Sequence, residues 1–573
     1  YFHNLKYDYH LLESYLNIIS KVEKDKQLYS FQVYYNSKII EFRDSYKLVS
    51  FPLSKFGSEF DLPNEIRKKE AIAYKYYTPD NNDKYINMET YSNYLPLDQV
   101  KIFEQNVLPF VQGDGRFNPT DYYKKYLEYD CLVLKKGIQK FNNLILSLTE
   151  MSVFDSLTIS SLADKYLINS GAYDGIYEVK GNLRSYISNA IAGGRVHVNE
   201  KYQKQVIEEK IADYDGVSLY PSAIYRLCNE KGFPKGKAYR LEKKNDWENY
   251  DYAILTVKIN KVNKKQQMPF ILHRGDEVSG YYNKAPSKPV IIDNQTLKDY
   301  IQFHDIEYEI LDGVYWNNGF NKKAGEIVNH LFQARLKCKK EGNKALSGVI
   351  KLILNSLYGK TIMKRSHTKD KIVKEKDFEN YISNNFNTIK SYRKLNKWNY
   401  SLNEITVDDS YNRSHIGCAI LSTSKRIMNE VFNIANENNL PIYYTDTDSI
   451  HMRYDDVPIL ESKYKIEYNR ELNGKQLGQF HCDFDMNNAC DEIYAIKSIF
   501  LGKKSYIDKL ESKDKNGNVI NDYHIRLKGI TQAGLDDIIK NEYKGEAFSL
   551  FEDLANGEEK DIILNPYDEE NRY

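Results

Sequence analysis

The sequence predicts an α+β protein built from several domains, and three observations lead to this prediction. The chain has 573 residues, and at roughly 150 residues per domain this length suggests about four domains or subdomains. Hydrophobic residues make up 41% of the chain and charged residues 28%, a balance that supports a substantial core. Strand patterns and long helical patterns alternate along the chain, which indicates a mixed fold.

The first 170 residues predict one α/β domain. Two strand patterns, at 28–35 and 39–42, are followed by a long helical pattern over 122–147. Five glycines between residues 170 and 194 then predict a linker. We therefore expect one domain at 1–170 and a second, larger region at 171–573.

The second region combines strands with one long helical block. Strand patterns occur at 210–215, 253–259 and 442–452, and helical periodicity extends from 324 to 360. A Glu-Gly-Asn segment at 341–343 interrupts this block. Because glycine commonly ends a helix and a short loop favours antiparallel neighbours, we expect a helical hairpin here.

Composition excludes several classes of protein. The chain carries 81 Lys and Arg against 80 Asp and Glu, so any nucleic-acid site must come from local clusters of basic residues. No apolar run approaches the roughly 18 residues that a membrane span needs. The six cysteines contain no C-x-x-C pair, which argues against a zinc ribbon or a disulfide framework. We interpret His481, Cys482 and Cys490 as ordinary packing residues.

Three acids stand out by their positions. Asp446 and Asp448 lie at the tip of a predicted hairpin, and the alternation of a strand places both on one side. Two like charges this close repel unless a cation lies between them, although aspartate is also a common turn former. Asp215 ends another predicted strand, with Asp213 as a second candidate two residues earlier. A third carboxylate facing the pair would complete a cage for two metal ions.

A polar stripe follows one face of the helical block. Lys344, Lys351, Asn355 and Tyr358 have the spacing of one helix face, while apolar residues occupy much of the rest. A lysine beside an apolar base suits binding of a triphosphate. The alternative is the solvated face of an ordinary amphipathic helix.

Together, these segments resemble the family B DNA polymerases, and most closely the protein-primed branch of small phages, adenoviruses and linear plasmids. The segments that look like motifs A, B and C, in the family's order, are Asp215-x-x-Ser218-Leu219-Tyr220-Pro221, Lys351-x-x-x-Asn355-Ser356-x-Tyr358-Gly359 and Tyr444-x-Asp446-x-Asp448-Ser449. Lys504-Ser505-Tyr506 is similar to the K-x-Y motif of the same branch.

The resemblance implies a right-hand polymerase that follows an RNase H-like 3′–5′ exonuclease domain at 1–170. In this arrangement the polymerase domain spans 171–573. Its parts would be a palm at 195–260 and 405–500, an insertion at about 261–323, a fingers helical hairpin at 324–360, a second insertion at about 361–404 and a thumb at about 501–573.

The resemblance also implies roles for single residues. Asp215 and Asp448, with Asp446 beside them, would hold two Mg²⁺ or Mn²⁺ ions, and Lys351 would neutralise the charge of the triphosphate. Tyr220 would lie under the sugar, where a 2′-hydroxyl would clash. The other implied nucleotide contacts are Ser218, Leu219, Asn355 and Tyr358. The implied DNA contacts are His3, Asn4, Gly193, Gly194, Gly359, Lys504 and Tyr506.

The start of the chain resembles the exonuclease motifs of the same family. The opening Tyr1-Phe-His3-Asn4-Leu-Lys-Tyr-Asp8 resembles the second motif, and Tyr126 to Asp130 has the Y-x-x-x-D spacing of the third. The resemblance implies that Asp8, Tyr126 and Asp130 serve the exonuclease, with both aspartates as metal ligands. The Asp-x-Glu of the first motif would precede Tyr1. We therefore expect a fragment whose own proofreading is impaired.

We expect a DNA-dependent DNA polymerase that replicates a linear viral or plasmid genome. Expected partners are template-primer DNA, dNTPs, a terminal protein that provides the priming hydroxyl, and a single-stranded DNA-binding protein, with no membrane and a monomeric chain. The expected location is the cytoplasm of an infected host cell or the compartment that holds a linear plasmid. Two alternatives stay open: a catalytically inactive DNA-binding replication scaffold, and a polymerase of another template or sugar preference, such as a reverse transcriptase.

Overall fold

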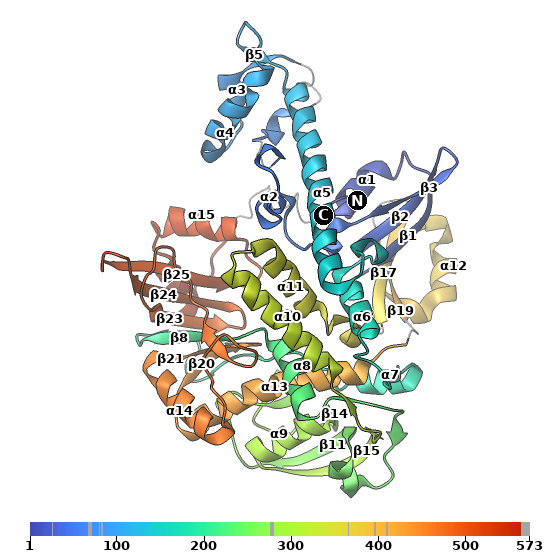
Figure 1. The fold of residues 1–573 in the computed structure, drawn as a ribbon, viewed down its shortest axis with the longest axis vertical. Helices are drawn as coiled ribbons and strands as arrows, with labels where there is room; N and C mark the ends of the chain where they lie inside the picture. Colours follow the sequence, from blue (N-terminus) through green and yellow to red (C-terminus); the bar gives the residue numbers. More distant parts are fainter. Residues whose placement is uncertain are drawn as a thin grey trace. The chain divides into compact units, whose positions relative to one another are not determined.

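The computed structural model describes residues 1–25, 27–66, 71–78, 81, 84–274, 280–364, 366–394, 397–407 and 411–562. These residues form a mixed α+β fold (Figure 1), as predicted. The chain divides into two compact units. Unit 1 comprises Tyr1–Tyr166, Leu331–Ser356 and Ser366–Val407, and unit 2 comprises Leu167–His330, Leu357–Arg365 and Asp408–Tyr573.

Unit 1 begins with a helix packed on an antiparallel sheet of three strands. The elements are α1 (Leu5–Leu12), β1 (Ile18–Lys24), β2 (Gln27–Tyr35) and β3 (Lys38–Arg43), with β2 in the centre. Alternation along β2 buries Leu28, Phe31 and Val33 in one cluster with Leu5 and Tyr9 of α1. The two strands predicted from the sequence are present, each within one residue of the expected ends.

The longest helix of unit 1 is α5 (Pro119–Thr149), which contains the predicted helical pattern. The Asn118 side chain caps its first turn, and proline follows at the first helical position. The buried face of α5 packs on an aromatic cluster with α3 (Met88–Ser92) and α4 (Leu97–Val107). The shorter elements of this region are α2 (Phe56–Glu59), β4 (Ile86–Asn87), β5 (Arg116–Phe117) and α6 (Ile159–Asn169).

The predicted helical block consists of α10 (Lys323–Lys340) and α11 (Lys344–Ser356), joined at Gly342 with φ +72°. On α11, Lys351 and Asn355 are exposed and the apolar residues are buried, as predicted. Tyr358 does not extend this stripe, because the helix ends at Ser356. The Tyr358 carbonyl instead accepts the N–H and the hydroxyl of Thr361, which closes a tight 3₁₀ turn.

A small sheet completes unit 1. Its strands are β17 (Ser366–Lys374), β19 (Asn399–Val407) and β18 (Ile389–Lys394), in this order, and helix α12 (Glu375–Asn385) follows β17 along the chain. An aromatic group of Phe378, Tyr392 and Tyr400 connects the helix to the strands.

Unit 2 starts in the predicted glycine-rich linker, which contains a helix, α7 (Gly181–Ser188). Its residue Ile187 is fully buried in a cluster with Trp316 and Cys418. Gly171, Gly175 and Gly181 have positive φ, the conformation that glycine adopts most easily in turns. This segment is therefore packed structure as well as a connection.

A nine-stranded antiparallel sheet forms the centre of unit 2. Its order is β25-β24-β23-β8-β21-β20-β6, with β22 paired to β8 and β7 paired to β23. The strands are β6 (Val196–Val198), β7 (Val206–Ile207), β8 (Ile211–Gly216), β20 (Ile442–Asp446), β21 (Ser449–Arg453), β22 (Phe480–Cys482), β23 (Tyr494–Gly502), β24 (Ser505–Lys513) and β25 (Val519–Leu527).

Helices and a second sheet surround this centre. Helix α13 (Ser414–Glu437) is buried along most of its length and contacts α8 (Leu219–Glu230). The remaining helices are α9 (Asn294–His304), α14 (Val457–Tyr468), α15 (Gln532–Glu542) and α16 (Ala547–Ala555). The second sheet has the order β10 (Tyr239–Arg240), β15 (Ile306–Trp316), β11 (Tyr252–Val262) and β14 (Val290–Asp293). Two short pairs are β9 (Phe233–Pro234) with β16 (Phe320–Asn321), and β12 (Ile271–His273) with β13 (Gly280–Tyr282).

Across the described residues, no helix has the length and apolar character needed to cross a membrane.

Candidate active site

The register of the nine-stranded sheet brings three of the predicted acids to one end of neighbouring strands. Asp215 on β8 lies opposite Ser449, the first residue of β21. Asp446 lies opposite the same serine across the β20–β21 hairpin. The Gly216 N–H donates to the Asp448 carbonyl oxygen at 2.8 Å. Asp215, Asp446 and Asp448 therefore converge, although 231 positions separate the first two in the sequence (446 − 215).

The tip of this hairpin is a two-residue turn of Thr447 and Asp448. Thr447 has φ +67°, a conformation that β-branched residues rarely adopt. Its N–H donates to the Arg195 carbonyl at 2.7 Å. A Cβ on Gly194 would lie 2.5 Å from Thr447 Cγ2. The predicted glycine pair is thus placed against the acid turn, and its second member is packed directly on it.

The acids have unequal surroundings. Burial, together with the nearby carboxylates of Asp446 and Asp483, raises the pKa of Asp448 to about 6. Asp446 is paired with Lys504, whose Nζ lies 2.7 and 2.9 Å from the two carboxylate oxygens. An ammonium group thus lies where carboxylates concentrate negative charge. Such a cluster of oxygen donors suits a hard divalent cation.

Two tyrosines flank the acids. The rings of Tyr220 and Tyr358 stack with centroids 4.2 Å apart. Burial raises the pKa of both phenols, and the nearby Asp448 carboxylate adds to both shifts. The sequence motifs predicted a shared pocket for these residues, and the structure brings them together beside Asp448.

Tyr220 is the second residue of α8, and Ser218, just before the helix, is in the left-handed region with φ +50°. Among the described residues, no side chain caps this helix start. The first backbone N–H groups of a helix lack intrahelical partners and can bind phosphate. Leu219, the first residue of the helix, is buried, so its backbone and not its side chain is suited to ligand contact.

Asp213 does not lie with the other three acids. It faces the same side of β8 as Asp215, but it is one row deeper, 3% exposed and opposite His451. Its Oδ1 lies 3.4 Å from His451 Nδ1. The sequence interpretation of Asp213 as a second candidate at the acid tip is therefore not supported.

The K-x-Y segment lies at the turn between β23 and β24. Lys504, with φ +60°, donates its backbone N–H to the Tyr444 hydroxyl at 3.0 Å. Tyr506 is 6% exposed and packs against Tyr444 and His451. The pairing of Lys504 with Asp446 was not predicted, and strand alternation gives no signal for it, because Lys504 lies in the turn before β24.

The remaining polymerase candidates are spread over both units. Lys351 and Asn355 lie exposed on α11 in unit 1. Gly359 begins the 3₁₀ turn Gly359–Ile362 in unit 2. The three acids and both tyrosines also belong to unit 2.

The residues of the predicted second exonuclease motif form a compact group in unit 1. His3 uses both ring nitrogens, at 3.0 Å from Ser45 Oγ and 2.9 Å from the Phe51 carbonyl oxygen. The Asn4 N–H donates to Asp44 Oδ1 at 3.0 Å. Asp8 follows on α1, where burial, with a contribution from Asp44, raises its pKa.

The predicted third exonuclease motif lies on α5. Tyr126 and Asp130 share a helix face, as expected from their spacing, and hydrogen-bond to each other. The Tyr74 hydroxyl donates to the Tyr126 hydroxyl at 3.2 Å. Burial raises the pKa of Asp130, and the Tyr126 hydrogen bond opposes this shift. Burial raises the pKa of Tyr123, and the nearby Tyr7 and Asp130 add to this shift.

Carboxylates at a hairpin tip, beside an uncapped helix start and stacked tyrosines, define a candidate site for cation-dependent phosphoryl chemistry. A family model described as DNA polymerase type B, organellar and viral, matches residues 1–440. The chain therefore belongs to this family. The predicted resemblance of the chain to family B DNA polymerases is confirmed.

Two curated relatives and one solved structure illustrate the similarity. A DNA polymerase of Kluyveromyces lactis is 24% identical over 535 residues, which cover 87% of this chain and 49% of that protein. A probable DNA polymerase of Podospora anserina is 24% identical over 541 residues, covering 87% and 40%. The chain thus spans half or less of these relatives. Its fold is similar to phi29 DNA polymerase complexed with primer-template DNA and incoming nucleotides, with a TM-score of 0.60, 17% identity and coverage of 93% and 84%.

Proposed function

We propose that this chain is a DNA-dependent DNA polymerase in which Asp215, Asp446 and Asp448 hold two Mg²⁺ or Mn²⁺ ions. The observation that carries the proposal is the convergence of these carboxylates from β8 and the β20–β21 hairpin. The donor set fits, because carboxylate oxygens are the ligands that both ions prefer. The Lys504 ammonium on Asp446 is a further sign that this position attracts positive charge. Bound ions would supply charge stabilisation at the attacking and leaving oxygens.

The protein groups around the acids position the substrate. The reaction joins the primer 3′ oxygen to the α-phosphorus of a dNTP and releases pyrophosphate. The open N–H groups at the start of α8, next to Ser218 and Leu219, would orient the phosphates. Lys351 of α11 would offset their charge, with Asn355 one turn further along the helix. The stacked rings of Tyr220 and Tyr358 would form the floor beneath the sugar and the nascent base pair.

Tyr220 is the proposed basis of sugar selectivity. Its ring is fixed by stacking on Tyr358 at 4.2 Å, so it cannot easily move away from a bulkier sugar. A 2′-hydroxyl would clash with a ring held in this way. The fixed ring therefore favours dNTPs over ribonucleotides. The reverse-transcriptase alternative is disfavoured by the bulky Tyr220 and by the hairpin, whose aspartates are separated by one residue and not adjacent.

We assign the parts of a right-hand polymerase to the observed elements. The palm would be strands β6, β7, β8, β20, β21, β22 and most of β23 of the nine-stranded sheet, with α8 and α13, within 195–260 and 405–500, while β24 and β25 of that sheet follow residue 501. The fingers would be α10 and α11, within 324–360, and the thumb would begin at about residue 501. The segments 261–323 and 361–404 would be insertions, and 1–170 would be an exonuclease domain of RNase H type.

We further propose protein priming of a linear viral or plasmid genome. The family match to organellar and viral enzymes supports this assignment, as does the K-x-Y segment with Lys504 at the acid group. Partners would be template-primer DNA, dNTPs and a terminal protein, in the compartment that holds the genome. Primer-template contacts would come from Gly193, Gly194, Gly359, Lys504 and Tyr506.

The exonuclease residues support a weaker proposal. His3 and Asn4 would hold the single-stranded 3′ end, beside Asp8, Tyr126 and Asp130. Two carboxylates provide few ligands for two-metal hydrolysis. We therefore propose that the 573-residue chain degrades a 3′ end much more slowly than it extends one.

Primer extension with Asp448→Ala tests the proposed polymerase. Wild-type protein should extend a primer in the presence of Mg²⁺ and dNTPs, and Asp448→Ala should lose this activity by several orders of magnitude. Asp455→Ala, an exposed acid of the same unit, should retain it. Equal activity of Asp448→Ala and wild type would overturn the assignment. Wild-type protein that binds DNA without extending it would favour the scaffold alternative.

A further inference from the structure

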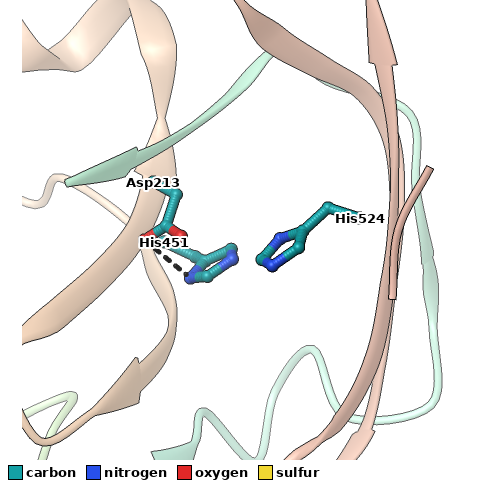
Figure 2. Close-up of side chains that lie close together, drawn as sticks. All are labelled: Asp213, His451 and His524. Atoms are coloured by element: carbon teal, nitrogen blue, oxygen red, sulfur yellow. Dashed lines mark ion pairs between the residues drawn. The ribbon is translucent and has the colours of Figure 1, made fainter. Parts of the chain in front are cut away.

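We propose that Asp213, His451 and His524 form a second metal site, suited to Zn²⁺, in the interior of the sheet below the acid turn. Each residue offers one ligand atom, and the three atoms lie within 4.8 Å of one another. Figure 2 shows the His524 ring directed toward the Asp213–His451 pair from the opposite side. The residues come from β8, β21 and β25, so the site connects strands that are distant in the sequence.

Asp213 and His451 leave polar atoms unsatisfied in a buried place. Asp213 is 3% exposed and His451 is fully buried. Within the described part of the chain, Asp213 Oδ1 and His451 Nδ1 make no hydrogen bond and lie 3.4 Å apart. Buried polar atoms in proteins are nearly always satisfied, and a bound ion is one of the explanations for a group that is not. Two such atoms close together, with His524 directed toward them, favour a common ligand.

The separation of Asp213 and His451 fits metal ligands better than a direct hydrogen bond. Asp213 Oδ1 and His451 Nδ1 are 3.4 Å apart, whereas a charge-assisted hydrogen bond of this type is about 2.7–2.9 Å long. Zinc binds imidazole nitrogen and carboxylate oxygen at about 2.0–2.2 Å in tetrahedral geometry, which sets neighbouring ligand atoms about 3.3–3.5 Å apart. The Asp213–His451 separation lies in this range.

Asp508 on β24 supplies the expected second carboxylate. Its Oδ2 lies 3.3 Å from His451 Nε2 and 3.3 Å from His524 Nδ1, and its Oδ1 accepts the Ser498 hydroxyl at 2.6 Å. A metal-bound histidine usually donates its other N–H to a carboxylate, which fixes the ring. With Nε2 of His451 and Nδ1 of His524 both facing Asp508, Nδ1 of His451 and Nε2 of His524 are left for the ion.

Charge and donor type point to zinc and not magnesium. One divalent ion would neutralise the two buried carboxylates of Asp213 and Asp508 while both imidazoles stay neutral. Imidazole nitrogens suit Zn²⁺, whereas Mg²⁺ prefers oxygen ligands. The two proposed sites are therefore chemically distinct, although they share the face of β8. The zinc would tie β8, β21 and β25 together beneath the acid turn.

Metal analysis of the full chain tests this site. The protein is stripped with EDTA, incubated with Zn²⁺ in excess Mg²⁺, separated from free metal by gel filtration and analysed for zinc. Wild type should retain one Zn²⁺ per chain, and so should the double variant Asp215→Asn/Asp448→Asn, which lacks two of the three catalytic acids. His524→Asn should lose the zinc. His481→Asn, on the neighbouring strand β22, should keep it.

His524 is the preferred target because its side chain is 21% exposed, so the variant is expected to fold, and circular dichroism would verify this. As a second readout, Co²⁺ should give the intense visible absorption of a tetrahedral nitrogen and oxygen site in wild type, and this absorption should be lost in His524→Asn. Zinc-free wild type, or equal zinc in wild type and His524→Asn, would overturn the proposal. The cluster would then be held by protons shared between its histidines and carboxylates.

Discussion

Asp448 is a carboxylate whose surroundings disfavour its charged form. Burial and the neighbouring acids raise its pKa to about 6, compared with about 3.9 for an unperturbed aspartate. The folded state therefore binds the proton more tightly than the unfolded state. In the metal-free chain, the ionised Asp448 therefore lowers the free energy of unfolding. This effect has its full size above about pH 6 and becomes smaller as the pH falls toward about 4.

The variant Asp448→Asn, which mimics the protonated form, tests this imbalance. Without divalent ions at pH 7.5, we expect the free energy of unfolding to rise by about 1–3 kcal/mol relative to wild type. The gain should shrink toward pH 4 and also on addition of Mg²⁺, which only the wild-type carboxylate binds well. Denaturant unfolding across this pH range provides the measurement. A variant that is less stable than wild type at pH 7.5 would show that the charge is already compensated.

Position 194 requires glycine because a side chain there would collide with Thr447, and not because of its backbone conformation. A Cβ at this position would lie 2.5 Å from Thr447 Cγ2 and 3.0 Å from Thr447 Cα, so the acid turn would have to move. We expect Gly194→Ala to lower the rate of nucleotide addition on the order of 10²-fold, because small displacements of catalytic groups are costly. Gly113→Ala is the control, since no atom lies within 4 Å of its added Cβ. Equal loss in both variants would contradict this explanation.

Tyr220 makes a prediction about the sugar. Tyr220→Val removes the ring that stacks on Tyr358 and should raise incorporation of ribonucleotides relative to deoxyribonucleotides by about tenfold or more. Tyr220→Phe keeps the ring and should keep the discrimination. Steady-state incorporation of matched dNTP and rNTP substrates measures both ratios. Unchanged discrimination in Tyr220→Val would place the sugar elsewhere.

At the scale of elements, helix α11 shows which features a sequence reveals. Its exposed Lys351 and Asn355 and its buried apolar side follow directly from helical periodicity. The helix end was less predictable: Tyr358 leaves the helix because Thr361 satisfies its carbonyl in a 3₁₀ turn. Helical spacing alone predicts Tyr358 on the same face as Lys351. Because the helix ends at Ser356, the Tyr358 ring instead stacks on Tyr220.

The same helix carries a testable role for its lysine. If Lys351 offsets the charge of the triphosphate, Lys351→Ala should lower kcat/KM for dNTPs on the order of 10²-fold. Lys344→Ala, two turns earlier on the same exposed face, is the matched control and should change kcat/KM by less than about threefold. Single-nucleotide addition at varied dNTP concentration measures both. Equal effects would point to general electrostatic attraction by the helix.

The hairpin contacts were beyond sequence reasoning for a different reason. Lys504 reaches Asp446 because the β23–β24 turn lies near the β20–β21 turn. Alternation shows which residues share a face of one strand, but it does not give the order of strands in a sheet. Only the order β24-β23-β8-β21-β20 makes this ion pair possible.

At the scale of the whole molecule, short sequence motifs predicted the acid site. The buried histidine cluster and the division into two units depend instead on pairing between segments that are distant in the sequence. Asp215, Asp446 and Asp448 could be identified because each lies in a short, recognisable segment. Asp213 was noticed only for its position beside Asp215, and its partners His451, Asp508 and His524 carry no such signal. The four residues come from four strands and meet only in the folded sheet. The two compact units likewise combine segments that are distant along the chain.

The central claim is that acids from β8 and from the β20–β21 hairpin together bind divalent cations. A titration of Mn²⁺ followed by electron paramagnetic resonance tests it without depending on activity. The titration would use a His524→Asn background, so that the buried histidine cluster does not contribute. Asp215→Asn and Asp448→Asn should each weaken Mn²⁺ binding by about tenfold or more, whereas Asp455→Asn should leave it unchanged. Wild-type Mn²⁺ affinity in either of the first two variants would contradict the account.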